Sequence, residues 1–558
     1  MNDRRYMENT AELINRQART KLPIHGKRLM TFNKGKLYPV TTIEILPGDT
    51  VNLNIRALIR ATTMIKPIMD DMWAQIQCFF VPNRLTCEHW EEIMGENKQG
   101  PYLTNKTTYE VPKLAAPSGG WAEKSLADYL GIPTKIGNIS VNSLYTKGVA
   151  KVFNDWYRDE NRVNFANITT GNSNLTGSNG TNQVTDIELG GAIPNVAKAH
   201  DLFTSSAIEP QKGPAVLLPL GTTAPVIGNG KALGITYDGT NAKALGATGT
   251  GTMRLADNST IGNAGAYATF STAFGADKQL GLSTDGTKSG VIADLTKATA
   301  SSVNELRLAL ALQQMLEIDA ISGTRYTEII YSHFGIKSPD ARLQRSEYLG
   351  GKKIPISISQ VIQQSESGTT PQGNLAGMSQ TWTGDEYFTK SFTEHGILYV
   401  FVCVKSENVY QQGLPAKFSK FKRTDYYDPI FANIGMQPIY NRELYAQGST
   451  VVDTNGNVID DQAFGYKEAW DEYRTFDNDV AGEFRSNATN TLDYWHLARE
   501  FSALPTNGDV FIQEGTANLD RALTVASSTA DQFQSVFAIG GSITRVMPAH
   551  SIPGLRRF

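Results

Sequence analysis

The sequence has no hydrophobic run long enough to cross a membrane. Its longest apolar run, Ile397 to Val404, has the length of a β-strand, whereas a membrane-spanning helix needs about 20 apolar residues. The N-terminal segment carries basic residues but no apolar stretch, so we expect no secretory signal. The sequence therefore predicts a soluble protein that is made in a cytoplasm and has no membrane insertion.

Cysteine and charge are both scarce. Three cysteines, Cys78, Cys87 and Cys403, cannot form a paired disulfide framework and fit a reducing compartment. Charged residues make up only 19% of the chain, which excludes a coiled coil. The 7 Trp, 22 Tyr and 23 Phe are ample for packed cores and exclude a fully disordered chain. At 558 residues, the chain is too long for one hydrophobic core.

Motifs for catalysis and cofactor binding are missing as well. A phosphate-binding Walker loop needs Lys-Ser or Lys-Thr after its glycines, and the Gly-Lys pairs at 35–36 and 230–231 are followed by other residues. Cys78, Cys87 and His89 match no zinc-ligand spacing. The other histidines have no Ser or Cys nucleophile signature beside them. The sequence therefore predicts no active site, no cofactor and no bound metal, and hence no enzyme.

Strand patterns occur along most of the chain. Val51, Leu53 and Ile55 alternate with polar residues, a period of two that buries one face of a strand. Residues 75–81 and 396–404 are more continuously apolar, as in a strand buried on both faces. These patterns indicate a protein built mainly from β-strands.

Few helices are expected. Good helix formers over 303–322 end at a glycine, and helical character resumes over 326–334. The Asn-Gly pair at 455–456 lies between β-branched residues and predicts a type I′ hairpin. Strands that pair across long insertions favour an antiparallel sandwich or jelly roll over alternating βαβ units.

The composition changes between about 160 and 300. This stretch is rich in Gly, Asn, Thr, Ser and Ala and poor in charge, which predicts an ordered, loop-rich insertion with short strands. We therefore divide the chain into five segments. They are a basic N-terminal arm (1–36), the first part of the core (37–160), the insertion (161–300), a helix with the remainder of the core (301–544) and a basic C-terminal tail (545–558).

Charge is distributed unevenly. Residues 1–36 carry a local charge of +6 and residues 545–558 carry +3, which leaves −12 on the segment between them. Two basic ends on an acidic body favour arms that bind a polyanion, although solvated charged termini are the alternative. The candidate contacts to a nucleic acid are Arg4, Arg5, Arg16, Arg19, Lys21, Lys27, Arg28, Arg545, Arg556 and Arg557.

Three segments resemble a known family. They are QCFFVPNRLTCEHWEEIM at 77–94, PDARLQRSEYLGG at 339–351 and YYDPIFANIGMQPIYNRELYAQ at 426–447. Together they resemble the major capsid proteins of microviruses, the small icosahedral single-stranded DNA phages, and are most similar to the gokushovirus branch. The resemblance covers most of 30–160 and 300–450. One departure is Ser346, where the family usually has Pro.

The resemblance implies an eight-stranded antiparallel jelly-roll barrel with large loop insertions and a few helices. It also implies assembly of about sixty copies into a T=1 icosahedral shell around a circular single-stranded DNA genome. In this branch a long insertion builds protrusions at the threefold axes, and 161–300 is the natural counterpart. We expect this protrusion to bind a host surface receptor.

Further partners are implied by the resemblance alone. They are a DNA pilot protein, a small DNA-binding protein and, during assembly in the bacterial cytoplasm, an internal scaffolding protein. The alternative to a capsid subunit is a soluble carbohydrate-binding β-sandwich, which the Asn-, Gly- and Tyr-rich loops suggest. That alternative predicts a monomer that binds glycans, whereas a capsid protein predicts uniform icosahedral particles.

Overall fold

The structure is a computed structural model that describes residues 19–98, 107–217, 303–366, 372–476 and 478–550, with short strands between 226 and 293. It divides into two compact units. We call Met1–Lys212 with Glu317–Phe558 the body, and Gly213–Leu316 the insertion unit. The described part of the chain is mainly β, with antiparallel sheets and few helices, which confirms the predicted fold class at that level.

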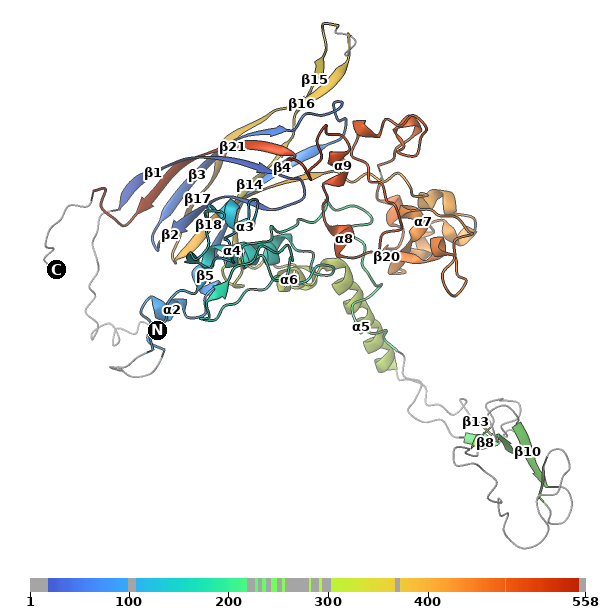
Figure 1. Cartoon of the computed structure of the whole chain (residues 1–558). Coiled ribbons are helices and arrows are strands. Elements are labelled where there is room, and N and C mark those ends of the chain that lie inside the picture. Colours follow the sequence, from blue (N-terminus) through green and yellow to red (C-terminus); the bar gives the residue numbers. More distant parts are fainter. Residues whose placement is uncertain are drawn as a thin grey trace. The chain divides into compact units, whose positions relative to one another are not determined.

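The first large sheet of the body joins strands from the two ends of the chain (Figure 1). All neighbouring pairs are antiparallel, and Thr20 lies opposite Arg545. Residues 20–32, part of the predicted basic arm, are thus a strand of this sheet. In order across the sheet, the strands are β1 (Thr20–Phe32), β21 (Phe533–Arg545), β3 (Thr50–Ala61) and β17 (Thr381–Ser391).

The second large sheet contains the predicted apolar strands. Ten of the eleven residues of its third strand are buried, because helices cover one side of the sheet and the other large sheet covers the opposite side. In order, its strands are β14 (Glu347–Pro355), β4 (Met72–Pro82), β18 (Gly396–Ser406) and β2 (Tyr38–Ile45). The helices against it are α3 (Leu126–Leu130) and α4 (Leu144–Val152).

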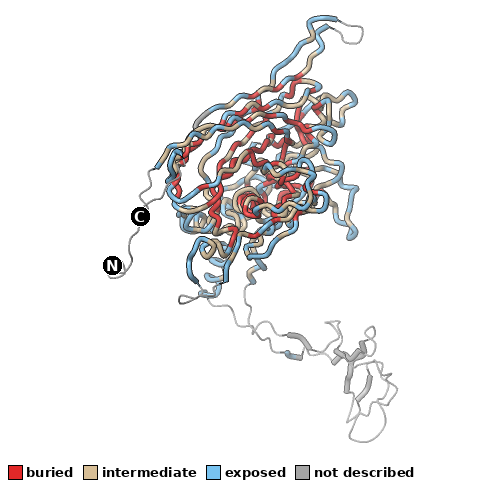
Figure 2. The backbone as a smooth tube through the Cα atoms, turned by 60° about the vertical axis from the view of Figure 1, so that its left-hand side comes forward, coloured by how far each residue is buried: buried red, intermediate tan, exposed pale blue. Residues whose placement is uncertain are grey.

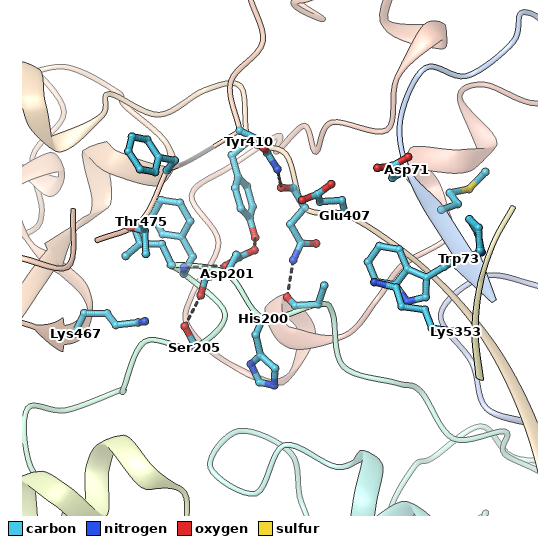
Figure 3. Close-up of a pocket in the computed structure, with 18 residues that line it drawn as sticks. Asp71, Trp73, His200, Asp201, Ser205, Lys353, Glu407, Tyr410, Lys467 and Thr475 are labelled. Carbon is cyan, nitrogen blue, oxygen red and sulfur yellow. Dashed lines mark hydrogen bonds between the residues drawn. The ribbon is translucent and has the colours of Figure 1, made fainter. Parts of the chain in front are cut away.

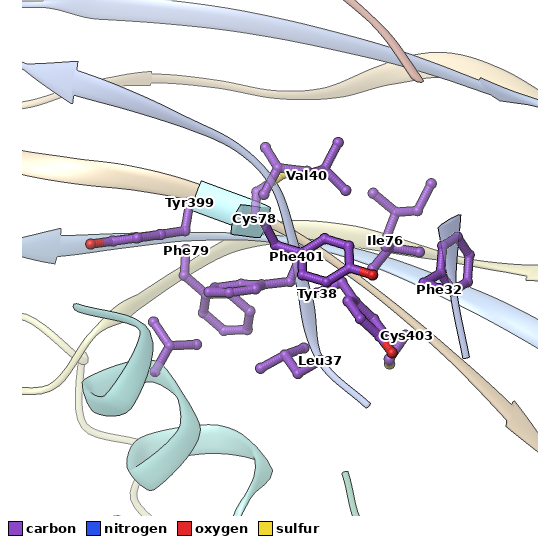
Figure 4. Packing of buried hydrophobic residues seen from close by; sticks show 14 of the residues in the cluster. Phe32, Leu37, Tyr38, Val40, Ile76, Cys78, Phe79, Tyr399, Phe401 and Cys403 are labelled. Atoms are coloured by element: carbon purple, nitrogen blue, oxygen red, sulfur yellow. The ribbon is translucent and has the colours of Figure 1, made fainter. Parts of the chain in front are cut away.

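Buried side chains of the two large sheets form one continuous hydrophobic cluster. Figure 2 colours all buried residues of the described chain red along the backbone. Phe32 of β1 stacks on Phe533 of β21 with ring centroids 5.5 Å apart. Tyr399 stacks on Phe401 within β18 at 5.7 Å, and these rings lie among other apolar side chains in Figure 4. This shared core fits a β-sandwich, and the described strands do not form a closed barrel.

Shorter elements complete the body. Its remaining strands are β5 (Lys113–Ala115), β6 (Ser140–Asn142), β7 (Leu175–Thr176), β15 (Ile358–Ile362), β16 (Leu375–Ser379), β19 (Met436–Tyr440) and β20 (Ala463–Glu468). Its remaining α-helices are α2 (Trp90–Ile93), α6 (Tyr326–Phe334), α7 (Asn441–Leu444), α8 (Asp509–Ile512) and α9 (Ala517–Asp520). The helix α5 (Val303–Ser322) has residues in both units. The helices predicted at 303–322 and 326–334 are therefore confirmed.

The insertion unit contains short antiparallel strands in its described part. They are β8 (Val226–Gly228), β9 (Leu233–Thr236), β10 (Ala242–Ala247), β11 (Met253–Leu255), β12 (Gly281–Leu282) and β13 (Val291–Ala293). This compact unit begins at residue 213 and not at the predicted boundary of 161. Residues 161–212 belong to the body, because Ile187 and Val196 are fully buried in its core.

Two local predictions can be compared with the structure. The turn at 453–457 closes with the Asp453 amide donating to the Asn457 carbonyl at 2.9 Å. Gly456 has a positive φ of 84° but Asn455 does not, so the prediction of a type I′ turn, which needs both, is wrong. Ser346 is fully buried, and its amide donates to Asp155 at 2.8 Å. Proline could not make this bond, so serine suits its local structure.

Gly148 provides a test of the packing between α4 and β18. A Cβ added at Gly148 would lie 2.1 Å from the Tyr399 hydroxyl oxygen, which donates to the Tyr145 carbonyl at 2.9 Å. Gly→Ala in a helix normally stabilises by up to about 1 kcal/mol. We expect Gly148→Ala to destabilise the chain instead, by about 1–3 kcal/mol, because it overpacks the core. Urea unfolding measures this difference.

Gly171→Ala is the matched control, because a Cβ there meets nothing within 4 Å. It should change the unfolding free energy by less than about 0.5 kcal/mol. A stabilised Gly148→Ala variant would contradict the packing of α4 against β18.

Candidate nucleic-acid interface and assembly surfaces

The pairing of β1 with β21 brings the two basic ends of the described chain together. Arg19 directly precedes β1 and Arg545 ends β21. Arg19 donates to the Gly48 carbonyl and to the Thr50 hydroxyl, the latter at 2.9 Å. Arg545 donates to the fully buried Asp49 carboxylate at 2.9 Å. Both arginines therefore hold the turn between β2 and β3.

The other described candidates lie on β1. Arg28 is half-buried and donates to the carbonyls of Val40 and Tyr129 at 3.1 and 2.6 Å, and burial lowers the pKa of its guanidinium. Lys21 and Lys27 point the other way and are exposed. Of the described candidates, these two lysines are the ones whose ammonium groups face solvent. The remaining candidates, Arg4, Arg5, Arg16, Arg556 and Arg557, lie outside the described residues.

A buried ion network lies beside β1. The Lys34 ammonium is 2.6 Å from one Glu514 oxygen, and the Arg499 guanidinium is 2.9 Å from the other. Burial raises the pKa of Glu514, but the charges of Lys34 and Arg499 outweigh it and lower that pKa to about 2. Lys34 also donates to Asn518 and Ser406 at 2.6 and 2.8 Å. Sequence reasoning missed this network, since its members are far apart along the chain.

A cavity of about 720 Å³ lies beside the end of β18 (Figure 3). On one side, the Tyr410 hydroxyl donates to the Asp201 carboxylate at 2.8 Å. On the other, the Lys353 ammonium lies 3.6 Å from the centroid of the Trp73 ring. The two lining Ser and Thr hydroxyls, Ser205 and Thr475, donate to backbone carbonyls and not to a side-chain base, so the described lining shows no activated Ser, Thr or Cys nucleophile.

Large apolar side chains are exposed in two parts of the body. In residues 418–434, Phe421 and Ile430 are 86% and 85% exposed. In and after α6, Phe334 is 75% exposed and Ile336 is 60% exposed. We call these the 418–434 surface and the α6 surface. Large apolar side chains exposed within one short segment point to protein contacts, so both segments are candidate assembly surfaces.

Other chemistry is limited in the described part of the chain. Cys78, Cys87 and Cys403 are buried and unpaired, and burial raises the pKa of Cys403 to about 11. The described residues hold no cluster of three side chains able to bind a metal ion. The described helices include none that is both long enough and apolar enough to span a bilayer.

Comparison with known proteins decides the family. The family described as capsid protein (F protein) of phages matches residues 13–555. The chain belongs to this capsid protein family. The capsid protein VP1 of Spiroplasma virus 4 is 37% identical over 553 residues, which cover 97% of this chain and 96% of that relative. Those of Chlamydia phage 1 and Bdellovibrio phage phiMH2K are 36% and 37% identical, over 96% and 94% of this chain and 95% and 93% of theirs.

These matches confirm the resemblance to microvirus capsid proteins. The chain is a capsid protein, a component of the virion, and membership of the family indicates a structural role rather than a catalytic one. The exposed 418–434 and α6 surfaces fit this role, because a capsid protein covers part of its surface with neighbouring subunits.

The buried ion network of this capsid protein predicts a large effect of a single substitution. Glu514→Gln would leave the Lys34 ammonium and the Arg499 guanidinium buried beside each other without a counter-charge. We expect it to destabilise the chain by about 3–5 kcal/mol, measured by urea unfolding at neutral pH. Glu468→Gln, which breaks the half-exposed pair with Arg474, is the control and should cost less than about 1 kcal/mol.

The same network predicts an acid dependence. The pKa of Glu514 is about 2 in the folded chain and its ordinary value is 4.5. The carboxylate therefore stabilises the fold above about pH 4.5, and this contribution is lost as the pH falls toward 2. The loss should be smaller in Glu514→Gln. If Glu514→Gln and Glu468→Gln lowered the unfolding free energy equally at neutral pH, the buried ion network would be contradicted.

Proposed function

We propose that about sixty copies of this capsid protein form a T=1 icosahedral shell that encloses a circular single-stranded DNA genome. Two observations support the proposal together. The chain belongs to a capsid protein family, and its body leaves the apolar side chains of the 418–434 and α6 surfaces exposed. Assembly takes place in the cytoplasm of the host bacterium, with an internal scaffolding protein. A DNA pilot protein and a small DNA-binding protein are the further partners.

Within the shell, the eight long strands of the body form a jelly roll. Numbered from one to eight along the chain, the strands of the first large sheet have the order 1-8-3-6, and those of the second have the order 5-4-7-2. All connections except the one between the fourth and fifth strands therefore pass from one sheet to the other. This alternation supports the proposal, because it is the connectivity of two Greek keys in a double sheet.

The basic ends of the chain bind the genome without reading its sequence. Lys21 and Lys27 support this role because they are exposed on β1, which continues directly from the basic N-terminal segment. Each phosphate that a cation neutralises adds about 0.7 to the salt dependence of binding to a single strand. Arg19, Arg28 and Arg545 hold the protein itself together, so they contribute less to this binding.

The insertion unit forms the protrusion at the threefold axis and binds the host receptor. Its separation from the body as a compact unit supports this role, because a surface attachment can vary without disturbing the strands that carry the shell.

The test of the assembly is direct. Purified full-length chain, produced with its scaffolding partner, should give uniform icosahedral particles in negative-stain microscopy, because packing of copies against one another covers their exposed apolar surfaces. A monomer that stays dispersed and binds glycans would contradict the proposal and favour a carbohydrate-binding β-sandwich.

The role of the insertion unit has a separate test. We expect replacement of residues 218–302 by a short Gly-Ser linker to leave shells intact and to abolish adsorption to the host, measured by counting particles bound to cells. The deletion begins after residue 212 because residues 161–212 contribute to the core of the body. Failure to form shells would instead make the insertion unit a subunit contact.

A further inference from the structure

The first large sheet has one face turned away from the core. Side chains on its strands alternate, so Leu53 and Ile55 of β3 and Phe537 of β21 are buried while their neighbours in sequence are not. We call the opposite side of β1, β21, β3 and β17 the open face. The four strands lie side by side as one layer in Figure 1, and exposed residues alternate along β1.

An apolar row crosses the open face. Leu29 of β1 lies opposite Val536 of β21, which lies opposite Leu58 of β3, and Leu58 lies opposite Trp382 of β17. Leu29 is 72% exposed and Trp382 is 68% exposed. The solvent side of an antiparallel sheet normally carries polar side chains, so this row is a surface that needs a cover.

Cations flank the apolar row on both sides. The next outward row lies two residues further along each strand, about 7 Å from the apolar row. In it, Lys27 of β1 and Arg56 of β3 lie on either side of Ala538 of β21. Arg60 of β3 lies on the other side of the apolar row. Lys27, Arg56 and Arg60 are exposed. None of the three forms an ion pair with a described acidic side chain.

Three of the four strands of the face carry no acidic residue. β1, β21 and β3 contain no Asp or Glu along their whole length. The fourth strand, β17, contains Asp385 and Glu386, and Glu386 lies opposite Asn54. The Arg56 side chain lies across Gly384 of the next strand, where a Cβ would be 3.1 Å from its Cγ, so the glycine leaves room for the guanidinium to lie flat. Lys21 extends the exposed cationic side chains along β1.

We propose that the open face binds single-stranded DNA, with bases on the row of Trp382 and phosphates on Lys27, Arg56 and Arg60. The inference rests on the proposed enclosure of such a genome and names the surface that contacts it. Stacking on an exposed ring and pairing of cations with phosphates suit every base, so the binding does not depend on sequence. The DNA reaches this face directly from the N-terminal segment that precedes β1.

The charge pattern favours a nucleic acid over a second copy of the chain. Against protein, the cations on both sides of the apolar row would lose water without gaining a partner, unless the neighbour supplied acids at matching positions. Against single-stranded DNA, phosphates supply a counter-charge at every nucleotide.

The experiment measures binding of purified full-length chain, dissociated from shells, to fluorescent oligothymidylate by anisotropy over about 50–200 mM salt. Arg56→Ala with Arg60→Ala should lower the slope of log K against log salt by about 1.4, because each phosphate that is no longer neutralised removes about 0.7. Trp382→Ala should weaken binding about tenfold and leave the slope unchanged. Trp382→Phe and the double Arg→Lys variant should retain most of the binding.

Two control variants separate this inference from others. Lys337→Ala with Arg342→Ala removes two exposed cations elsewhere on the body and should leave the binding unchanged. Arg4→Ala, Arg5→Ala and Arg16→Ala test the N-terminal contacts of the proposed function. Because the side chains substituted on the open face are exposed, the thermal midpoint of each of those variants should match that of the original chain.

The outcomes are distinguishable. Loss of binding in the N-terminal variant alone would overturn the open face and leave the proposed function standing. An equal loss of binding in the Lys337→Ala, Arg342→Ala control would also overturn the open face as the DNA site, because any exposed cation of the body would then contribute equally to binding. Normal DNA binding with failed shell assembly in the Trp382 or arginine variants would make the face a contact between copies. Absence of binding in the original chain would overturn both proposals.

Discussion

The fold depends on the pairing of strands from opposite ends of the chain. β1 and β21 form an antiparallel pair from Thr20 and Arg545 to Phe32 and Phe533, and β3 pairs with the other edge of β21. The ion network of Lys34, Glu514 and Arg499 joins the same two ends beside the sheet. The sheet therefore cannot close until nearly all of the chain is present, which predicts slow folding through non-local contacts. The long segments between strands can vary in length because loop closure costs little extra free energy as a loop grows.

The second feature of the body is the apolar surface that one copy leaves uncovered. Phe421 and Ile430 on one surface and Phe334 on the other would be costly in a dispersed monomer. The family assigns the chain to a capsid, and we propose that neighbouring subunits cover these surfaces there. The open face of the first sheet differs from both surfaces, because cations border its apolar row on either side. This difference in charge is why we propose DNA as the ligand of the open face and protein as the partner of the other two surfaces.

Much of the local structure could be predicted from the sequence. The alternation at Val51, Leu53 and Ile55, the buried strand at 396–404 and the helix at 303–322 were all visible, because local periodicity reports burial. The boundary of the insertion could not be placed, since the loop-rich composition continues through residues 161–212 although they pack into the core. Composition indicates that a segment is rich in loops, but it does not indicate whether the segment packs into the core.

The candidate site was predicted only in outline, for a similar reason. The excess of positive charge at the ends was plain, but the roles of individual arginines depend on partners distant in sequence. Arg28 bonds to the Tyr129 carbonyl and Arg545 to Asp49, which no local pattern indicates. The row from Leu29 to Trp382 exists only once four strands are in register, so sequence reasoning did not find it.

We propose above all that other copies of the chain cover the exposed apolar surfaces of the body. Hydroxyl-radical footprinting of assembled shells and of dissociated chain measures this cover residue by residue. We expect labelling of Phe421, Ile430 and Phe334 to fall on assembly, while buried Phe401 stays unlabelled in both states. Equal labelling of the three exposed residues in shells and in dissociated chain would contradict it.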